Sequence, residues 1–247
     1  MGVRKKAAEK PEPNSLNASQ FIRELCALER KQVAVNAKYF RDTDNTNIIL
    51  GVQMSASFAM AKKYMRMPMT QIKVLLANNY YEVRMGAISI MDFRARDKKI
   101  TEEDRKALFD LYISMHKHIN NWDLVDRGAP YIVGGFLYDK PRTILYKLAR
   151  SKNIWERRTS IVATYYFIRK GETENTFSIA GILVNDKEDL INKAVGSWIR
   201  EAGKYNPGKL VDFLSKYAST MPRVTLRYAI EKLEKSEKSK YLNMQVK

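Results

Sequence analysis

One stretch, DLINKAVGSWIR at residues 189–200, decides the fold, because related stretches recur along the chain. The others are YYEVRMGAISIM at 80–91, NIWERRTSIVAT at 153–164 and RVTLRYAIEKL at 223–233. Each places a basic residue just before a small, apolar patch, which suggests that one structural unit is used several times. These basic residues are Arg84, Arg158, Lys193 and Arg227, separated by 74, 35 and 34 residues.

This spacing predicts a helical repeat. If 74 residues cover two units, the period is about 35–37 residues, in or near the range of paired-helix repeats such as HEAT and TPR. A single helix pair cannot bury its apolar face, so neighbouring pairs stack into a curved solenoid. We therefore predict an all-α, HEAT-like helical-repeat solenoid.

Other helix signals lie around the repeated stretches. Thr101 resembles the first residue of a capping box, and Pro141 sits where a helix would start. Gly203 and Pro207 stop the helix that precedes them. The one β-like run, 161–168, continues straight from a helical pattern, and we interpret it as a buried helix.

The ends of the chain differ in character from its middle. Residues 1–17 are basic and contain two prolines, which predicts a mobile N-terminal arm. Residues 236–247 form a charged C-terminal tail. We therefore expect a single repeat domain over residues 18–235.

The charge indicates a polyanionic partner. The chain of 247 residues carries 44 Lys and Arg against 27 Asp and Glu, a net charge of +17. Equivalent positions of a solenoid line up on one surface, so the repeated cations would form a basic stripe on the concave face, suited to a phosphate backbone. The alternative is that each cation is only the solvated end of its helix.

Composition excludes several other classes of protein. Cys26 is the only cysteine, so no intrachain disulfide can form, and a reducing compartment fits best. With two histidines besides, a Cys/His zinc site is excluded, and we expect no metal. No apolar run reaches membrane-spanning length, so we expect no membrane partner.

One repeat carries a carboxylate in place of the cation. Between Arg84 and Arg158 lies NNWDLVDRGAPYIV at 120–133, in which Asp126 takes the position of the cation. Trp122 lies four residues before Asp126, hence on the same helical face. An aromatic ring beside a carboxylate could stabilise an oxocarbenium-like sugar and a departing cationic base. The alternative is a half-buried Trp122, with Asp126 paired to Arg127 or to a neighbouring repeat.

At these residues the chain resembles the AlkD-like DNA alkylation repair family. NNWDLVDRGAP at 120–130 is similar to its catalytic segment. NIWERR at 153–158, KAVGSWIRE at 193–201 and LRYAIE at 226–231 are similar to its later repeats. AKYF at 37–40 and LGVQ at 50–53 resemble its N-terminal region. The resemblance runs from about residue 20 to residue 235.

The resemblance implies a cofactor-free and metal-free DNA glycosylase that releases positively charged N3- or N7-alkylated purines from duplex DNA held on its concave face. Asp126 would stabilise the sugar cation and orient water, while Trp122 and Tyr39 would contact the lesion. The DNA backbone would contact the four repeated cations and three further residues. The complete set is Gln53, Arg84, Arg158, Lys193, Arg200, Lys204 and Arg227.

One position departs from the family pattern, which has a second Trp directly after the Gly of its KA-x-G segment. Here Ser197 follows that Gly, and Trp198 comes next. One residue turns a helix by about 100°, so we expect Trp198 to point elsewhere, into the interface between repeats.

Two alternative functions stay open, and the departure at Ser197 favours the first of them. One is a non-catalytic binder of damaged or branched DNA on the same scaffold. The other is a HEAT-type protein-interaction scaffold, which the net charge disfavours. For the glycosylase we expect alkylated double-stranded DNA as partner, a monomer, and a cytoplasmic location, associated with the nucleoid when the protein is bound to DNA.

Overall fold

The computed structural model describes residues 16–29 and 47–244. Within these ranges the chain is helical, and its one β contact is an isolated parallel bridge between Ile48 and Tyr80. The prediction of an all-α helical-repeat fold is confirmed. None of the described helices is both long and apolar enough to cross a membrane.

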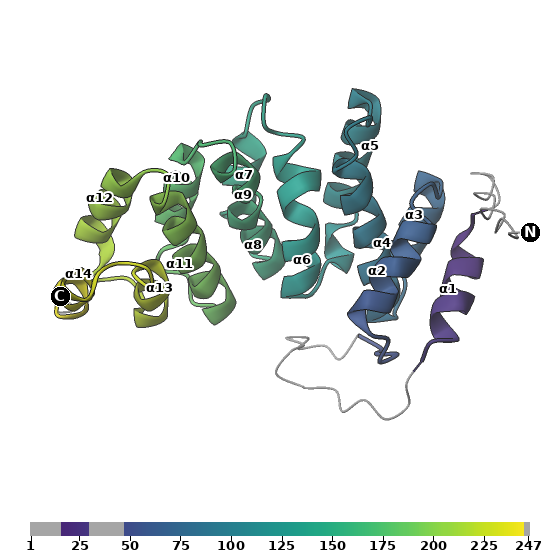
Figure 1. The fold of residues 1–247 in the computed structure, drawn as a ribbon, viewed down its shortest axis with the longest axis horizontal. Helices are drawn as coiled ribbons and strands as arrows, with labels where there is room; N and C mark the ends of the chain where they lie inside the picture. Colours follow the sequence, from purple (N-terminus) through teal and green to yellow (C-terminus); the bar gives the residue numbers. More distant parts are fainter. Residues whose placement is uncertain (1–15, 30–46, 245–247) are drawn as a thin grey trace, which may run out of the picture. The chain divides into compact units, whose positions relative to one another are not determined.

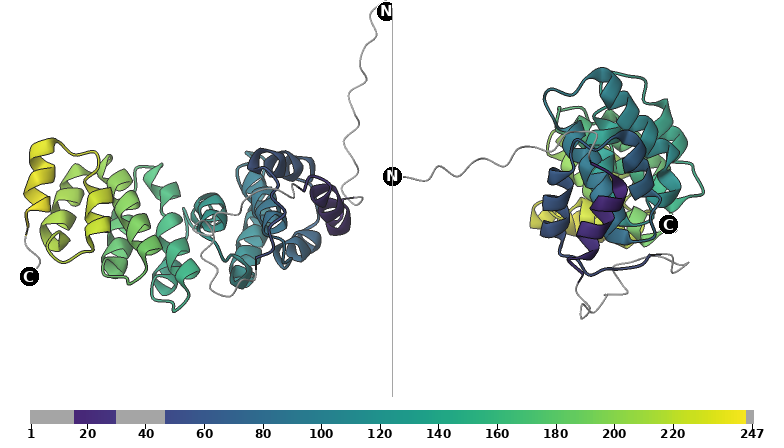
Figure 2. Two further views of the ribbon diagram at one scale, coloured as in Figure 1. Left: turned by 90° about the horizontal axis from the view of Figure 1, so that it is seen from below. Right: turned by 90° about the vertical axis from the view of Figure 1, so that its right-hand side faces the viewer.

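The chain forms two compact units, residues 1–94 and 95–247. The repeat domain that we expect over residues 18–235 therefore includes parts of both units. Each unit is described separately below (Figures 1 and 2).

Unit 1 contains α1 (Ala18–Cys26), α2 (Met54–Lys63), α3 (Met69–Leu76) and α4 (Tyr81–Ala95). All residues of α4 from Tyr81 to Asp92 are buried, including the charged residues Glu82, Arg84 and Asp92. Phe21 of α1 packs on α4 directly over Gly86, where a Cβ atom would stand 2.4 Å from the ring. The helix α1 therefore touches α4 through Phe21, and it also packs on α2 and α3.

Unit 2 is a row of helix pairs. It contains α5 (Glu102–Ser114), the 3-10 helix η2 (His116–His118), α6 (Trp122–Gly128) and the π-helix η3 (Ala129–Gly134). These are followed by α7 (Thr143–Leu148), α8 (Ile154–Val162), α9 (Tyr165–Ile168), α10 (Glu174–Leu183) and α11 (Asp189–Gly203). The row ends with α12 (Pro207–Tyr217), α13 (Arg223–Ala229) and α14 (Lys235–Leu242).

The second helix of each pair contacts the second helix of the next pair along the chain. Thus α6 packs on α8, α8 on α11, and α11 on α13. The first helices α7, α10 and α12 pack against α8 and α11 (Figure 1). The repeated stretches at 153–164, 189–200 and 223–233 thus supply the continuous inner row of the stack. Equivalent positions in these stretches therefore lie near one another in space.

The local helix signals are confirmed, except that α7 begins at Thr143, two residues after Pro141. Thr101 caps α5, because its hydroxyl accepts a hydrogen bond from the Asp104 N–H at 3.1 Å. The helix α11 ends at Gly203, and Pro207 begins α12. Residues 161–168 are the end of α8, a short turn and α9, so the β-like run is helical with one interruption.

A glycine sets the contact between α11 and α13. A Cβ atom on Gly196 would lie 2.5 Å from the Thr225 carbonyl oxygen and 2.6 Å from the Tyr228 Cβ. Because the first of these atoms belongs to the backbone, it cannot move aside as a flexible side chain would. The two helices can therefore approach this closely only with glycine at position 196.

We predict that Gly196→Ala destabilises the protein by about 1–3 kcal/mol, the usual cost of forcing extra volume into a packed interface. The measurement is the free energy of unfolding in urea. Gly208→Ala is the control, since its new Cβ would meet only the Asn206 side chain, at 3.7 Å. Equal stability of Gly196→Ala and the control would contradict this account of the α11–α13 contact.

Candidate active site

The helix α6 presents Trp122 and Asp126 to one pocket, as their four-residue spacing predicts. Both side chains are partly exposed, whereas Leu124 and Val125 between them are fully buried. The pocket has a volume of about 480 Å³ and lies entirely within unit 2. Its lining comes from α6, α8, α11 and α13, the inner helices of four successive pairs.

An ion pair joins α6 to α8 at the base of the pocket. Arg158 donates from Nε to Asp126 Oδ1 at 2.9 Å and from Nη2 to Oδ2 at 2.8 Å. Its Nη1 donates to the Leu190 carbonyl oxygen at 2.7 Å. The partner of Asp126 is thus a cation of the neighbouring repeat, one of the two alternatives that the sequence left open, and the carboxylate is fixed at both oxygens.

Two opposing effects act on the charge of Asp126. Burial raises the pKa of this carboxyl above its ordinary value, and the Arg158 guanidinium acts in the opposite direction. The carboxylate side chain keeps 32% of its surface exposed, whereas the side chain of Arg158 keeps only 9%. The carboxylate therefore faces the open pocket, and the guanidinium lies behind it.

The helix α11 forms the opposite wall of the pocket. Lys193, Ala194, Ser197 and Trp198 all line it. The expectation that Trp198 points away from the site is therefore wrong, because Ser197 and Trp198 both line the pocket. The expected contact with a neighbouring repeat is present as well, since the indole packs on the Tyr165 ring of α9 at 5.0 Å.

Tyr228 of α13 completes the wall, and sequence reasoning missed it. A signal was available, because Tyr228 directly follows the repeated cation Arg227 just as Ala194 follows Lys193. The position after the cation lines the pocket in both repeats. Leu190, whose carbonyl oxygen accepts from Arg158, was also missed, since a backbone acceptor leaves no trace in residue type.

A buried hydrogen-bond network supports α8 beside the ion pair. The Thr159 hydroxyl contacts the Tyr112 hydroxyl at 3.1 Å and His116 Nε2 at 2.9 Å. Burial lowers the pKa of His116 to about 4, so the imidazole is neutral at pH 7. This network ties α5 and η2 to the residue that follows Arg158.

The repeated cations lie in different environments. Arg84, in unit 1, is buried and donates to the Asn78 carbonyl oxygen at 2.6 Å and to the Asn47 side chain. Arg158 is buried in its ion pair. Lys193 lines the pocket and pairs with Asp189 at 2.7 Å, and Arg227 is exposed. The cation therefore recurs at the same position of the repeat, whereas the exposure of its side chain differs from one repeat to another.

The remaining predicted contacts lie apart from the pocket lining. Arg200 and Lys204 both pair with Glu201, at 3.4 and 2.6 Å. Gln53 is exposed at the start of α2 in unit 1. Tyr39 lies outside the described residues. Within the described ranges, no group of three or more His, Cys, Asp or Glu side chains is arranged to hold a metal ion.

Comparison with known proteins supports the resemblance. The family model described as "DNA alkylation repair enzyme" matches residues 22–233. A solved structure, described as a "predicted DNA alkylation repair enzyme" from Enterococcus faecalis, superposes with a TM-score of 0.63. It is 17% identical, over 77% of this chain and 90% of that one, so the likeness concerns the fold. Among curated proteins, none matches the sequence.

We predict that Arg158→Met raises the pKa of Asp126 further, because burial then acts without the opposing cation. The loss of stability should be about 1–3 kcal/mol, less than for a fully buried pair because the carboxylate is partly exposed. Titration of the Asp126 carboxyl carbon by NMR measures the pKa. An unchanged pKa would show that the ion pair does not control the charge of Asp126.

We also predict that the protein loses stability as the pH falls from 6.5 to 4. The unfolded chain binds a proton at His116 near pH 6.5, whereas the folded protein binds it only near pH 4. Protonation of His116 should account for up to about 3 kcal/mol of the free energy of unfolding that is lost. Urea unfolding at pH 7 and pH 4 tests this, since His116→Gln should remove that part of the pH dependence and the control His118→Gln should not.

Proposed function

The chain belongs to the family of DNA alkylation repair enzymes, and on this premise we propose that it is a monofunctional DNA glycosylase. Its substrates would be positively charged N3- or N7-alkylated purines in duplex DNA. The observation that carries the proposal is the clamped carboxylate of Asp126, which faces a pocket with aromatic walls.

The chemistry follows from the charge of the substrate. As the bond between C1′ and the purine nitrogen breaks, its electron pair goes to the alkylated base, which leaves neutral. Because this base already carries the positive charge that an acid would supply, a single carboxylate is sufficient. The sugar becomes an oxocarbenium-like cation, which the Asp126 carboxylate stabilises. Water then adds to C1′ and loses a proton, with Asp126 orienting it. Neither a metal nor an organic cofactor is needed in this scheme.

Arg158 acts as a positioning residue in this proposal. Its two hydrogen bonds fix the plane of the Asp126 carboxylate, and its bond to the Leu190 carbonyl oxygen fixes the guanidinium. The cation also favours the ionised form of Asp126, which the reaction requires. The predicted grip of Arg158 on the DNA backbone would compete with this ion pair, so we assign phosphate contacts first to other cations.

Lys193 and Arg227 are the best placed of those cations. Lys193 lines the pocket, Arg227 is exposed beside Tyr228, and both come from the inner row of helices. Arg200 and Lys204 lie outside the pocket lining and pair with Glu201, and Lys193 would likewise have to exchange Asp189 for phosphate. Gln53, Arg84 and Tyr39 stay proposals from the family resemblance.

The aromatic walls favour catalysis over binding alone. The argument for a non-catalytic binder is that Ser197 stands where the family pattern has a Trp. Trp198 nevertheless lines the pocket opposite Trp122, and Tyr228 adds a third ring. Aromatic faces of this kind attract a cationic base and stack on its plane. In this chain α11 therefore supplies an aromatic side chain to the pocket from position 198, one residue after the position at which the family pattern has its Trp.

We predict that Asp126→Asn lowers the single-turnover rate of 7-methylguanine release from duplex DNA by about 10²- to 10³-fold, the usual effect of removing one preorganised electrostatic group. Duplex binding should persist, because the substitution removes a negative charge. Asp212→Asn, an exposed carboxylate of the same unit, is the control and should retain the wild-type rate.

Absence of release by the wild-type protein, with salt-dependent duplex binding intact, would contradict the glycosylase and favour the non-catalytic binder. Absence of both activities would favour the protein-interaction scaffold. We further propose that the glycosylase acts as a monomer in the cytoplasm and is associated with the nucleoid when it is bound to DNA.

A further inference from the structure

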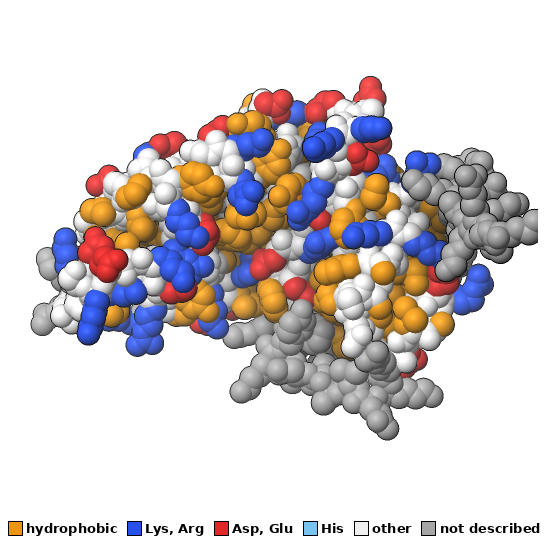
Figure 3. Space-filling view, in the orientation of Figure 1, with side chains coloured by type: hydrophobic (Ala, Val, Ile, Leu, Met, Phe, Trp, Pro, Cys, Tyr) orange, Lys and Arg blue, Asp and Glu red, His pale blue; other side chains and the backbone are white. Residues whose placement is uncertain are grey.

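A second surface of unit 2 combines exposed cations with partly exposed tyrosine rings. It lies beside α9 and η3 and does not contain Asp126. We name it the tyrosine–cation band and define it as Tyr131, Tyr138, Tyr166, Arg96, Arg169 and Lys170. In Figure 3, hydrophobic and basic side chains are mixed across the middle of this unit.

The three tyrosine rings of the band form one group. The Tyr166 ring lies 5.6 Å from that of Tyr131 and 5.7 Å from that of Tyr138, in edge-on contacts. All three are partly exposed, while the neighbouring Phe167 and Ile168 are buried and fill the core. Part of each of these three tyrosines is therefore exposed to solvent.

A close backbone approach brings these rings together. A Cβ atom on Gly134 would lie 2.2 Å from the Ala163 carbonyl oxygen and 2.9 Å from the Tyr166 Cβ. Glycine at this position lets η3 approach α9. The π-helical turn of η3 is itself a form often found at functional sites.

Cations surround the rings. The Arg96 guanidinium lies 3.7 Å from the centre of the Tyr131 ring, and Lys170 Nζ lies 5.8–5.9 Å from the other two rings. The Tyr165 hydroxyl raises the pKa of the neighbouring Arg169 guanidinium. The nearby carboxylates of Glu172 and Asp139 pair instead with Arg142 and Lys140. Within the described part of the chain, neither Arg169 nor Lys170 forms an ion pair.

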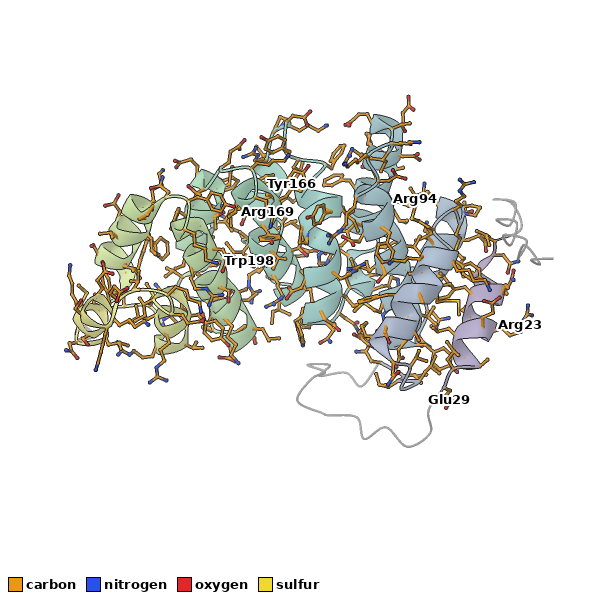
Figure 4. All side chains as sticks on the ribbon, in the orientation of Figure 1. Arg23, Glu29, Arg94, Tyr166, Arg169 and Trp198 are labelled. Atoms are coloured by element: carbon orange, nitrogen blue, oxygen red, sulfur yellow. The ribbon has the colours of Figure 1, made fainter. Side chains whose placement is uncertain are left out.

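The band is continuous with the pocket. Tyr165 lies next to the band residue Tyr166 in the chain, and its ring packs on Trp198 at a centroid distance of 5.0 Å. Trp198 in turn lines the pocket that contains Asp126. Figure 4 labels Tyr166, Arg169 and Trp198, which follow one another across the helices of unit 2. A chain-like ligand on the band would therefore run to the edge of the pocket.

We propose that the tyrosine–cation band binds single-stranded nucleic acid, with bases stacked on the exposed parts of the tyrosine rings and phosphates held by Arg169 and Lys170, while Arg96 stays on the Tyr131 ring. Base faces and phosphates occur together only in an unpaired strand, because a duplex keeps its base faces stacked inside. An acidic peptide would use the cations but would leave the rings without a planar partner. This inference does not rest on base release.

The test is fluorescence anisotropy with labelled ten-residue oligothymidine, a matched duplex and a poly-glutamate peptide. Tyr131→Leu combined with Tyr166→Leu should weaken binding of the single strand about tenfold or more, since each stacked base contributes strongly. Duplex affinity should stay within about twofold, because the duplex contacts no ring. Oligouridine in place of oligothymidine shows whether the ligand is RNA or DNA.

The control is Tyr217→Leu combined with Lys216→Gln, which removes a ring and a cation 5.0 Å apart elsewhere in unit 2. It should leave single-strand affinity unchanged. A second variant, Arg169→Gln with Lys170→Gln, changes only exposed side chains and therefore tests the band even if the tyrosine variant fails to fold. It should reduce the slope of log affinity against log salt by about 0.7 for each lost phosphate contact.

Three outcomes would overturn the proposal. The first is unchanged single-strand affinity in both band variants. The second is equal loss for the single strand and the duplex, which would make the band a general phosphate patch. The third is poly-glutamate binding as tight as oligothymidine binding, which would indicate an acidic protein partner. None of these outcomes bears on base release, so failure here leaves the glycosylase proposal standing.

Discussion

The bidentate ion pair between Asp126 and Arg158 is the interaction on which the candidate site depends. It joins α6 to α8, and the third hydrogen bond of Arg158, to the Leu190 carbonyl oxygen, extends the connection to α11. Three successive repeats are thereby fixed around one carboxylate. A partly buried carboxylate without this partner would be harder to ionise, and its plane would be free to turn. The same pair therefore serves both packing and chemistry.

The repeat explains how such a site can arise. Where Arg158, Lys193 and Arg227 place cations, one repeat places Asp126, so a carboxylate stands among basic residues of the same row. Cations on the inner row suit a phosphate backbone, whereas the single carboxylate suits a cation that develops during reaction. A stack of similar helix pairs can thus combine affinity for a polyanion with stabilisation of a positive transition state at one position.

The fold and the centre of the site could be predicted from the sequence, because both follow from short-range spacing. The interval between Trp122 and Asp126 places them on one helix face, and the recurring cation sets the repeat. The side of α11 that Trp198 occupies could not be predicted, since it depends on packing against Tyr165. Nor could the burial of Arg84, since its partners, the Asn78 carbonyl and Asn47, show no pattern in sequence.

In the proposed reaction, the positive charge of the alkylated base takes the place of an acid that would protonate the leaving group. The most direct test compares single-turnover release of 7-methylguanine and O6-methylguanine by the wild-type protein from the same duplex sequence. The two bases carry the same methyl group, but only the first has a cationic purine ring. We predict release of 7-methylguanine alone. Release of both at similar rates would contradict it, because the site would then need an acid that a lone carboxylate does not supply.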